Sequence, residues 1–162
     1  ISISDMISLL PRDPGIYVLV LLVRSTISTF IRSLGQINID KGRYIYLGSA
    51  RGSGGILARV NRHYIKRKKV RWHIDHLTIS SKVHIEGVVY AITQEDLERT
   101  LCEKLMELGF MPYIEGFGAS DYRAKGYSHL LKPPNMVDVF EVVSRAMSYI
   151  GLNPHVVVTG TI

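Results

Sequence analysis

The amino-acid sequence predicts an α+β domain with a small, mainly antiparallel central sheet flanked by helices. Two observations favour this class. Runs of strand length, separated by Gly and Pro turns, are interleaved with segments whose apolar residues recur at helical spacing. The 162 residues have the size of one ordinary domain, and 46% apolar content is enough for a core. We therefore expect a single domain over residues 1–162.

The N-terminal part predicts a short helix and a buried strand. Ser4 or Asp5 caps the helix, which stops at Pro11. After a Pro-Gly turn, the β-branched run 16–23 is typical of a central strand.

Residues 26–40 predict a hairpin that leads into a second central strand. Short alternating segments are divided near Leu34-Gly35, and a tight Lys-Gly turn at 41–42 starts the next strand. Alternation along that strand predicts two faces, one with Tyr44, Tyr46 and Gly48 and the other with Ile45 and Leu47. We expect it to pair antiparallel with the strand at 16–23.

Half of the cationic charge lies in residues 41–76. This segment holds ten of the twenty Lys and Arg residues and a single carboxylate, Asp75. Such focusing raises the local concentration of a polyanion, so a phosphate backbone is the first ligand to consider. A glycine-rich turn at 52–55 precedes a predicted helix over 56–67. Its packing face is predicted to hold Ile56, Leu57, Val60 and Tyr64, and the adjoining, anion-facing side Arg59, Arg62, His63 and Lys66.

The remaining chain predicts three helices and three strands. After a short helix within 71–80 and a third strand at 83–92, Thr93 begins the longest helix, with Asp96 completing a capping box. On that helix, Glu98 alone of five acids lies at the edge of the leucine stripe. Loop with a short strand follows the end of this helix at Gly109, and then come an apolar helix from about 135 to 150 and a terminal strand.

Composition excludes several classes. The single cysteine, Cys102, excludes an internal disulfide and a multi-cysteine zinc site, which favours a cytoplasmic protein. The longest apolar run has strand length, so we expect no membrane span. The first residues lack a basic segment and do not resemble a signal peptide.

Five elements together resemble the GIY-YIG nuclease superfamily. Gly15-Ile16-Tyr17 lies on one predicted strand and Tyr46-Leu47-Gly48 on the next, with Leu47 where the family pattern has Ile. Arg59 and His63 follow one helical turn apart, and Glu98 lies on a later helix. The resemblance spans residues 14–131, which leaves 132–162 as a C-terminal extension. A small archaeal-type subfamily of uncharacterised activity is resembled more narrowly, through the strings GRYIYLGSA, RHY, WHIDHL, GFGASD and SHL.

The resemblance implies a metal-dependent endonuclease that hydrolyses phosphodiester bonds of DNA, with repair or recombination as its setting. It implies one divalent cation, Mg²⁺ or Mn²⁺, held by Glu98, which suits the few carboxylate ligands that Mg²⁺ takes. Arg59 would bind the phosphate, Tyr17 would help to deprotonate water, and Tyr46 would orient that water. His63 would contact phosphate or relay a proton. An ordinary tyrosine pKa near 10 does not suit a base, so Tyr17 would need the cation and Arg59 to lower it.

Basic residues around these positions predict a phosphate-binding groove, and its members are Arg51, Arg62, Lys66, Arg67, Lys68, Lys69, Arg71 and His73. Zinc bound by His73, Asp75 and His76 is a weaker interpretation, because no fourth ligand is evident. Ser120, Asp121, Ser128 and His129 are expected to border the site. No nucleophile elbow surrounds either serine, so Ser-His-Asp hydrolysis is a poor alternative.

Two other interpretations stay open. The chain could keep the fold and the basic groove yet bind nucleic acid without cleaving it. The helix at 135–150 could also serve as a docking or homodimer face in a larger assembly.

Overall fold

A six-stranded antiparallel sheet forms the centre of the molecule, in the order β6-β7-β4-β1-β5-β8. The computed structural model describes residues 2–118 and 127–160. The strands of the sheet are β1 Gly15–Val23, β4 Gly42–Ala50, β5 Val83–Ile92, β6 Met111–Pro112, β7 Leu130–Lys132 and β8 His155–Val158. A separate two-stranded ribbon consists of β2 Ile27–Ile31 and β3 Gly35–Ile39. The predicted α+β class is confirmed.

Strand β1 lies in the middle of the sheet, between β4 and β5, and almost all of its residues are buried. It pairs along its whole length with β4 on one side and β5 on the other, both antiparallel. The predicted run 16–23, its antiparallel partner and the hairpin divided at Gly35 are all confirmed. In this register Tyr17 lies directly opposite Gly48.

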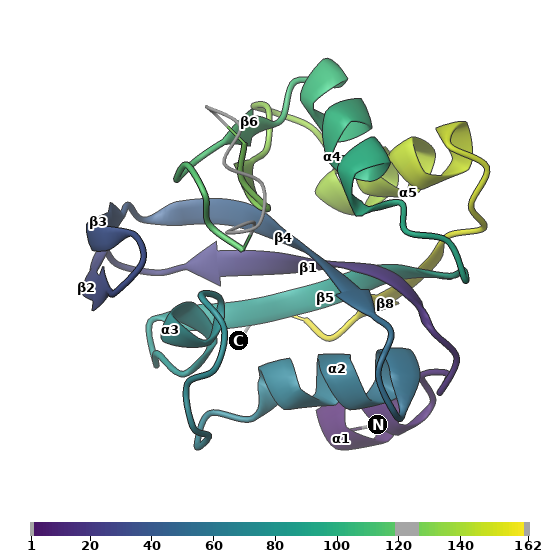
Figure 1. Cartoon of the computed structure of the whole chain (residues 1–162), viewed down its shortest axis with the longest axis horizontal. Coiled ribbons are helices and arrows are strands. Elements are labelled where there is room, and N and C mark those ends of the chain that lie inside the picture. Colours follow the sequence, from purple (N-terminus) through teal and green to yellow (C-terminus); the bar gives the residue numbers. More distant parts are fainter. Residues whose placement is uncertain (1, 119–126, 161–162) are drawn as a thin grey trace.

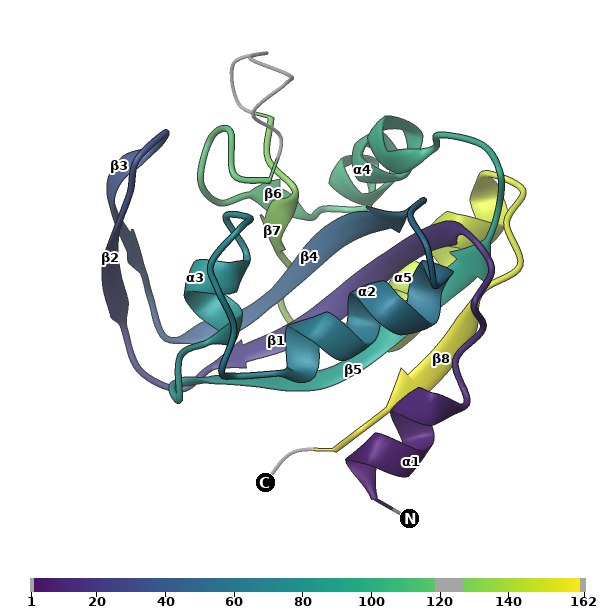
Figure 2. The ribbon, with the colours of Figure 1, turned by 60° about the horizontal axis from the view of Figure 1, so that its bottom comes forward.

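Helices cover both faces of the sheet (Figures 1 and 2). Their bounds are α1 Ile3–Ser8, α2 Gly55–Tyr64, α3 Asp75–Thr78, α4 Glu98–Glu107 and α5 Val139–Tyr149. Alternation along the strands divides the core: Tyr17, Tyr44 and Tyr46 pack with α2 and α3, whereas Ile45 and Leu47 pack with α4 and α5. The two predicted faces of β4 are therefore confirmed.

The longest predicted helix begins five residues later than expected, at Glu98 instead of Thr93. The hydroxyl of Thr93 accepts a hydrogen bond from the backbone N–H of Glu95, 3.1 Å away, so Thr93 stabilises a local turn. Asp96 therefore lies before the helix and completes no capping box. The correction places Glu98 in the first turn of α4.

The first helix also has a different cap from the one predicted. Ser2 is its N-cap, and the Ser2 hydroxyl accepts from the backbone N–H of Asp5 at 3.1 Å. Asp5 lies inside the first turn, where a carboxylate stabilises the helix dipole. Ser4 lies inside the helix as well.

Helix α2 is shorter than predicted because Ile65 is extended, which leaves Lys66 outside the helix. At the other end, the N–H groups of Ile56 and Leu57 bond to the carbonyls of Asp13 and Pro11. The start of α2 is thus satisfied by the chain itself and offers these donors to no ligand.

The C-terminal extension completes the sheet. Asp138 caps α5 by accepting from the backbone N–H of Glu141. The apolar side of α5, which includes Val143 and Met147, is buried against the sheet, and β8 pairs with β5. Docking through this helix stays a prediction. Within the described residues, no helix has the length and apolarity needed to cross a lipid bilayer.

Candidate active site

A cavity of about 180 Å³ opens beside β4, next to the two residues through which this strand pairs with the short strand β7. All five predicted catalytic residues line it, although they come from strands and from helices on both faces of the sheet. The lining consists of Tyr17, Tyr46, Leu47, Gly48, Ser49, Arg59, His63, Trp72, Glu98, Gly118 and His129. The structure therefore brings together residues as far apart in sequence as 17 and 129.

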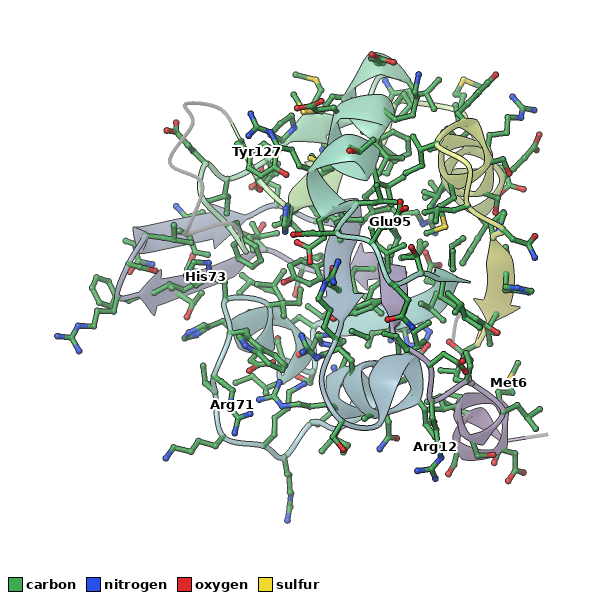
Figure 3. The ribbon with its side chains drawn as sticks, turned by 45° about the vertical axis from the view of Figure 1, so that its right-hand side comes forward. Met6, Arg12, Arg71, His73, Glu95 and Tyr127 are labelled. Atoms are coloured by element: carbon green, nitrogen blue, oxygen red, sulfur yellow. The ribbon has the colours of Figure 1, made fainter. Side chains whose placement is uncertain are left out.

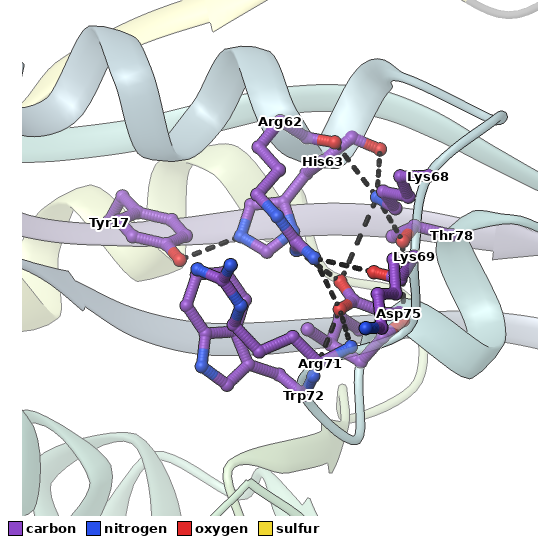
Figure 4. A network of polar contacts seen from close by, with 10 residues as sticks. Tyr17, Arg62, His63, Lys68, Lys69, Arg71, Trp72, Asp75 and Thr78 are labelled. Carbon is purple, nitrogen blue, oxygen red and sulfur yellow. Dashed lines mark hydrogen bonds and ion pairs between the residues drawn. The ribbon is translucent and has the colours of Figure 1, made fainter.

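Tyr17 and His63 form a buried pair in the lining of this cavity, and Figure 4 shows the contact between them. The Tyr17 hydroxyl lies 2.7 Å from Nε2 of His63, and each residue is 1% exposed. Burial, reinforced by the positive charge of Lys68, lowers the pKa of His63 to about 3. Nδ1 of His63 has no partner among the described residues. The helix face predicted to meet an anion thus places His63 inside the molecule.

Both tyrosines of the predicted site are neutral phenols in the free protein at neutral pH. Burial raises the pKa of Tyr17 well above its usual value, and Tyr46 adds to this, while Arg59 acts in the opposite direction. Burial also raises the pKa of Tyr46, and the negative charge of Glu98 adds to this. The expected lowering of the Tyr17 pKa is therefore absent from the protein alone.

Gly48 leaves the space that the Tyr17 ring occupies. A Cβ built on Gly48 would lie 2.4 Å from the Tyr17 oxygen, which is too close for any side chain. Because the two residues are opposite in neighbouring strands, the aromatic ring covers the glycine. The absence of a side chain at Gly48 therefore lets the Tyr17 ring lie against the backbone of β4.

Trp72 positions Arg59. The Arg59 guanidinium carbon lies 4.4 Å from the centroid of the indole ring, and that of Arg62 lies 4.3 Å from it. Such cation–π contacts hold a guanidinium in place while leaving its N–H donors available. Trp72 also lines a neighbouring cavity of about 220 Å³ together with Arg59, Arg62 and Arg71.

Asp75 is the buried centre of a polar network that fixes Trp72 (Figure 4). Its carboxylate accepts from both terminal nitrogens of Arg62 at 2.6 and 2.8 Å, and from the backbone N–H groups of Arg71 and Trp72. Burial alone would raise its pKa, but these hydrogen bonds outweigh it and lower the pKa to about 2. Asp75 therefore holds the wall of the cavity that carries Arg59.

Glu98 and His129 form the opposite wall. Oε2 of Glu98 lies 3.7 Å from Nδ1 of His129, and Nε2 of His129 lies 3.2 Å from the Tyr127 hydroxyl. The Glu98 side chain is 26% exposed, whereas that of His129 is 3% exposed. Glu98 is the one carboxylate that lines the cavity among the described residues.

Several predicted phosphate-binding side chains have partners within the protein. Arg62 binds Asp75, Lys66 donates to the carbonyls of Ser80 and Val83, and Lys68 donates to the Thr78 hydroxyl and the Arg62 carbonyl. Arg51 lies near Asp96 at 3.8 Å on the surface. These four charges serve internal contacts at least in part.

The three other predicted cations, Arg67, Lys69 and Arg71, have fewer contacts within the described part of the protein. Arg67 and Lys69 lie on the connection that follows α2, and their side chains form no hydrogen bond or ion pair within residues 2–118 and 127–160. The Arg71 guanidinium lies 5.8 Å from the Trp72 ring. Figure 3 shows Arg71 on the segment between α2 and α3, close to His73 in the chain.

His73 has a structural position at the edge of the site. Its Nδ1 accepts from the backbone N–H of Gly118 at 2.9 Å, and its Nε2 lies 2.7 Å from the Ser33 hydroxyl. Asp75 is occupied by Arg62, so the residues of the weaker zinc interpretation do not converge. Among described residues, no group of three or more His, Cys, Asp or Glu could hold a metal ion.

The serines and the other residues expected to border the site divide into three cases. Ser120 and Asp121 lie outside the described residues. Ser128 is buried, and its hydroxyl bonds to the backbone of Leu130, so it offers no nucleophile. His129 lines the cavity, as expected, but sequence reasoning gave it no role. Trp72 and Asp75 were likewise missed as positioning residues.

The cavity fits one divalent cation. A single carboxylate with an open position beside it matches the way Mg²⁺ binds, through one or two carboxylates, water and substrate oxygens. Two-metal chemistry would need further carboxylates, which the described lining lacks.

Comparison with known proteins gives a family. A family model described as "Domain of unknown function DUF123" matches residues 16–152, and the chain therefore belongs to that family. No curated protein matches the chain, and no solved structure does.

Proposed function

We propose that this member of the DUF123 family is a metal-dependent endonuclease of GIY-YIG type that hydrolyses phosphodiester bonds of DNA. The observation that carries the proposal is the convergence of Tyr17, Tyr46, Arg59, His63 and Glu98 on one cavity. These residues are the elements of the superfamily pattern. Their meeting in one site is a specific consequence of that pattern and would be a coincidence for unrelated sheet and helix residues.

Charge in the cavity suits a scissile phosphate. Arg59, which lies over the Trp72 ring, lines the space from one wall, and Glu98 lines it from the other. A cation held by Glu98 would supply positive charge that polarises the phosphate and lowers the pKa of bound water. Arg59 would donate charge-assisted hydrogen bonds to the non-bridging oxygens and stabilise the developing charge.

The Tyr17–His63 pair orients the attacking water. If Tyr17 donates its hydroxyl hydrogen to Nε2 of His63, the lone pairs of the phenol oxygen face the cavity. That oxygen then accepts a hydrogen bond from water and aims it at phosphorus. Water forms the new P–O bond as the ester P–O bond breaks; the attacking water releases one proton to solvent, and the leaving oxygen takes one proton from solvent.

A second candidate function has its own support. Since burial raises the pKa of both tyrosines, neither phenol is a strong base at neutral pH in the protein without a cation. A nucleic-acid-binding module that keeps this fold and its basic surface without cleaving would show the same feature.

One experiment separates the two functions. Supercoiled, branched and single-stranded DNA are incubated with the protein and Mg²⁺, Mn²⁺ or EDTA, and DNA binding is measured in parallel. A nuclease nicks at least one substrate with metal, and Glu98→Ala abolishes nicking while binding remains. Binding by the wild type without cleavage under any metal condition supports the binding module and contradicts the nuclease.

A further inference from the structure

We propose that His129 is a second protein ligand of the divalent cation held by Glu98. The cation would then bind one carboxylate oxygen and one imidazole nitrogen, with water and substrate at its remaining positions. The inference rests on the proposed function and deepens it, because it determines which cations the site accepts.

The distance between Glu98 and His129 suits two ligands of one ion. Oε2 of Glu98 and Nδ1 of His129 are 3.7 Å apart, beyond hydrogen-bond length, so neither atom satisfies the other. Adjacent ligand atoms, each about 2.1 Å from a metal, lie roughly 3 Å apart. A small rotation of Glu98, whose side chain is 26% exposed, closes the difference.

The His129 backbone is fixed from two sides. Its N–H donates to the Phe117 carbonyl at 2.8 Å, and its carbonyl accepts from the Leu47 N–H at 3.0 Å. The imidazole is almost fully buried, yet it lines the cavity. A ligand held in this way loses little freedom when it binds a metal.

Tyr127 supplies the outer contact that a ligating histidine needs. Metal-bound histidines usually donate their second ring N–H to an oxygen, which fixes the tautomer. The Tyr127 hydroxyl lies 3.2 Å from Nε2 of His129, and its ring packs edge-on with a centroid distance of 5.4 Å. Donation from Nε2–H to Tyr127 leaves the Nδ1 lone pair directed at Glu98.

Charge distinguishes His129 from the other histidine that lines the cavity. The charged neighbours of His63 are mostly cations, Lys68, Arg59 and Arg62, which would repel a metal ion. Those of His129 are the carboxylates of Glu98 and Asp96. Of the two histidines that line the described cavity, His129 therefore has a net negative surrounding and His63 a net positive one.

An imidazole ligand changes the preference among cations. Nitrogen donors suit Mn²⁺ and later transition metals better than Mg²⁺ or Ca²⁺, which favour oxygen. We expect Mn²⁺ to bind more tightly than Mg²⁺. We also expect His129→Gln to weaken Mn²⁺ binding by about 10-fold or more while affecting Mg²⁺ less.

The test detects the nitrogen directly and does not depend on activity. Full-length protein is titrated with Mn²⁺, and pulsed electron paramagnetic resonance measures coupling to ¹⁴N. The wild type should show ¹⁴N coupling, and labelling with ¹⁵N-histidine should change it to the ¹⁵N pattern. His129→Gln should lose the coupling, whereas the matched control His63→Gln should keep it. If His129→Gln does not fold, Tyr127→Phe replaces it and should weaken Mn²⁺ binding about 10-fold or more.

The outcomes separate this inference from the proposed function. Bound Mn²⁺ without nitrogen coupling, or coupling that persists in His129→Gln, would overturn His129 as a ligand. The nuclease proposal would survive that result if Glu98→Ala still abolished nicking. Absence of both Mn²⁺ binding and metal-dependent nicking in the wild type would overturn both.

Discussion

The Tyr17 hydroxyl lies 2.7 Å from Nε2 of His63, and the pair is buried beneath the cavity that Arg59 and Glu98 face. Because burial lowers the pKa of His63 and raises that of Tyr17, both are neutral at pH 7. The hydrogen bond therefore joins a phenol to a neutral imidazole and fixes the phenol oxygen.

Tyr17→Phe should lower the nicking rate by about 100-fold or more, because it removes the oxygen that orients water. DNA affinity, measured by fluorescence anisotropy, should stay within about twofold. Tyr44→Phe is the matched control, since Tyr44 lies on the same sheet face but bonds to the Asp40 carbonyl outside the cavity. Equal rate losses in the two variants would argue against a role for Tyr17.

Gly48→Ala should displace Tyr17, because the new methyl group would lie 2.4 Å from its oxygen. We expect a loss of about 1–3 kcal/mol in the free energy of unfolding from overpacking, together with a lower nicking rate. Gly52→Ala provides the control, since a methyl group at that position would have no neighbouring atom of the described residues within 4 Å. Urea unfolding and a nicking assay measure both effects, and an unchanged Gly48→Ala protein would refute the packing argument.

Asp75→Ala should reduce the free energy of unfolding by about 3–5 kcal/mol, because it leaves the Arg62 guanidinium without its buried partner. Glu141→Gln, in the exposed pair with Arg145, should change it by less than about 1 kcal/mol. Urea denaturation curves at pH 7 compare the two. Similar losses would mean that Asp75 does not organise the site wall.

Stability should fall on acidification below about pH 6.5. His63 has a pKa of about 3 in the folded protein, against an ordinary value of 6.5, so the unfolded chain binds more protons between these values. Its contribution is complete above pH 6.5 and is lost as pH falls towards 3, at up to about 1.4 kcal/mol per pH unit. Urea unfolding between about pH 7 and 5 should show a shallower slope for His63→Gln, and an identical slope would contradict the buried neutral state.

The basic residues should separate into binding and structural groups. Arg67→Ala and Lys69→Ala should each reduce the slope of log affinity against log salt by about 0.9 for each phosphate that is no longer neutralised. Lys68→Met should leave that slope unchanged and lower stability instead, because its ammonium group donates inside the protein. Salt titrations of DNA binding measure the slopes. A reduced slope in Lys68→Met would place this lysine at the interface.

The strands were predictable because alternation and β-branched runs report burial on a sheet directly. The family pattern likewise led to the expectation that Tyr17, Tyr46, Arg59, His63 and Glu98 share one cleft, and they line one cavity. Their chemical roles stay predictions. The predicted start of α4 was wrong because the Thr93 hydroxyl can stabilise a turn as readily as it can cap a helix.

Other features carry no periodic signal. Asp75 is a buried ion-pair partner, yet its sequence context is that of a surface residue in a basic segment. Lys68 and Arg62 were assigned to phosphate for the same reason, although tertiary contacts direct them inwards. His129 lies in a loop, and its position at the cavity depends on long-range backbone bonds to Phe117 and Leu47, which no local pattern reports.

Strand β7 joins β4 through the pairs Ile45–Leu131 and Tyr46–Leu130, and the bond from Leu47 to His129 comes next. Leu130 packs in one core layer and Leu131 in the other. If β7 shifted by one residue against β4, a leucine would therefore still pack into the core. The imidazole, however, would swing to the opposite side and a serine or leucine would take its place. A molecule with this register shift could stay folded and still lack the histidine at the cavity. The proposed cation site therefore depends on the register of a three-residue strand.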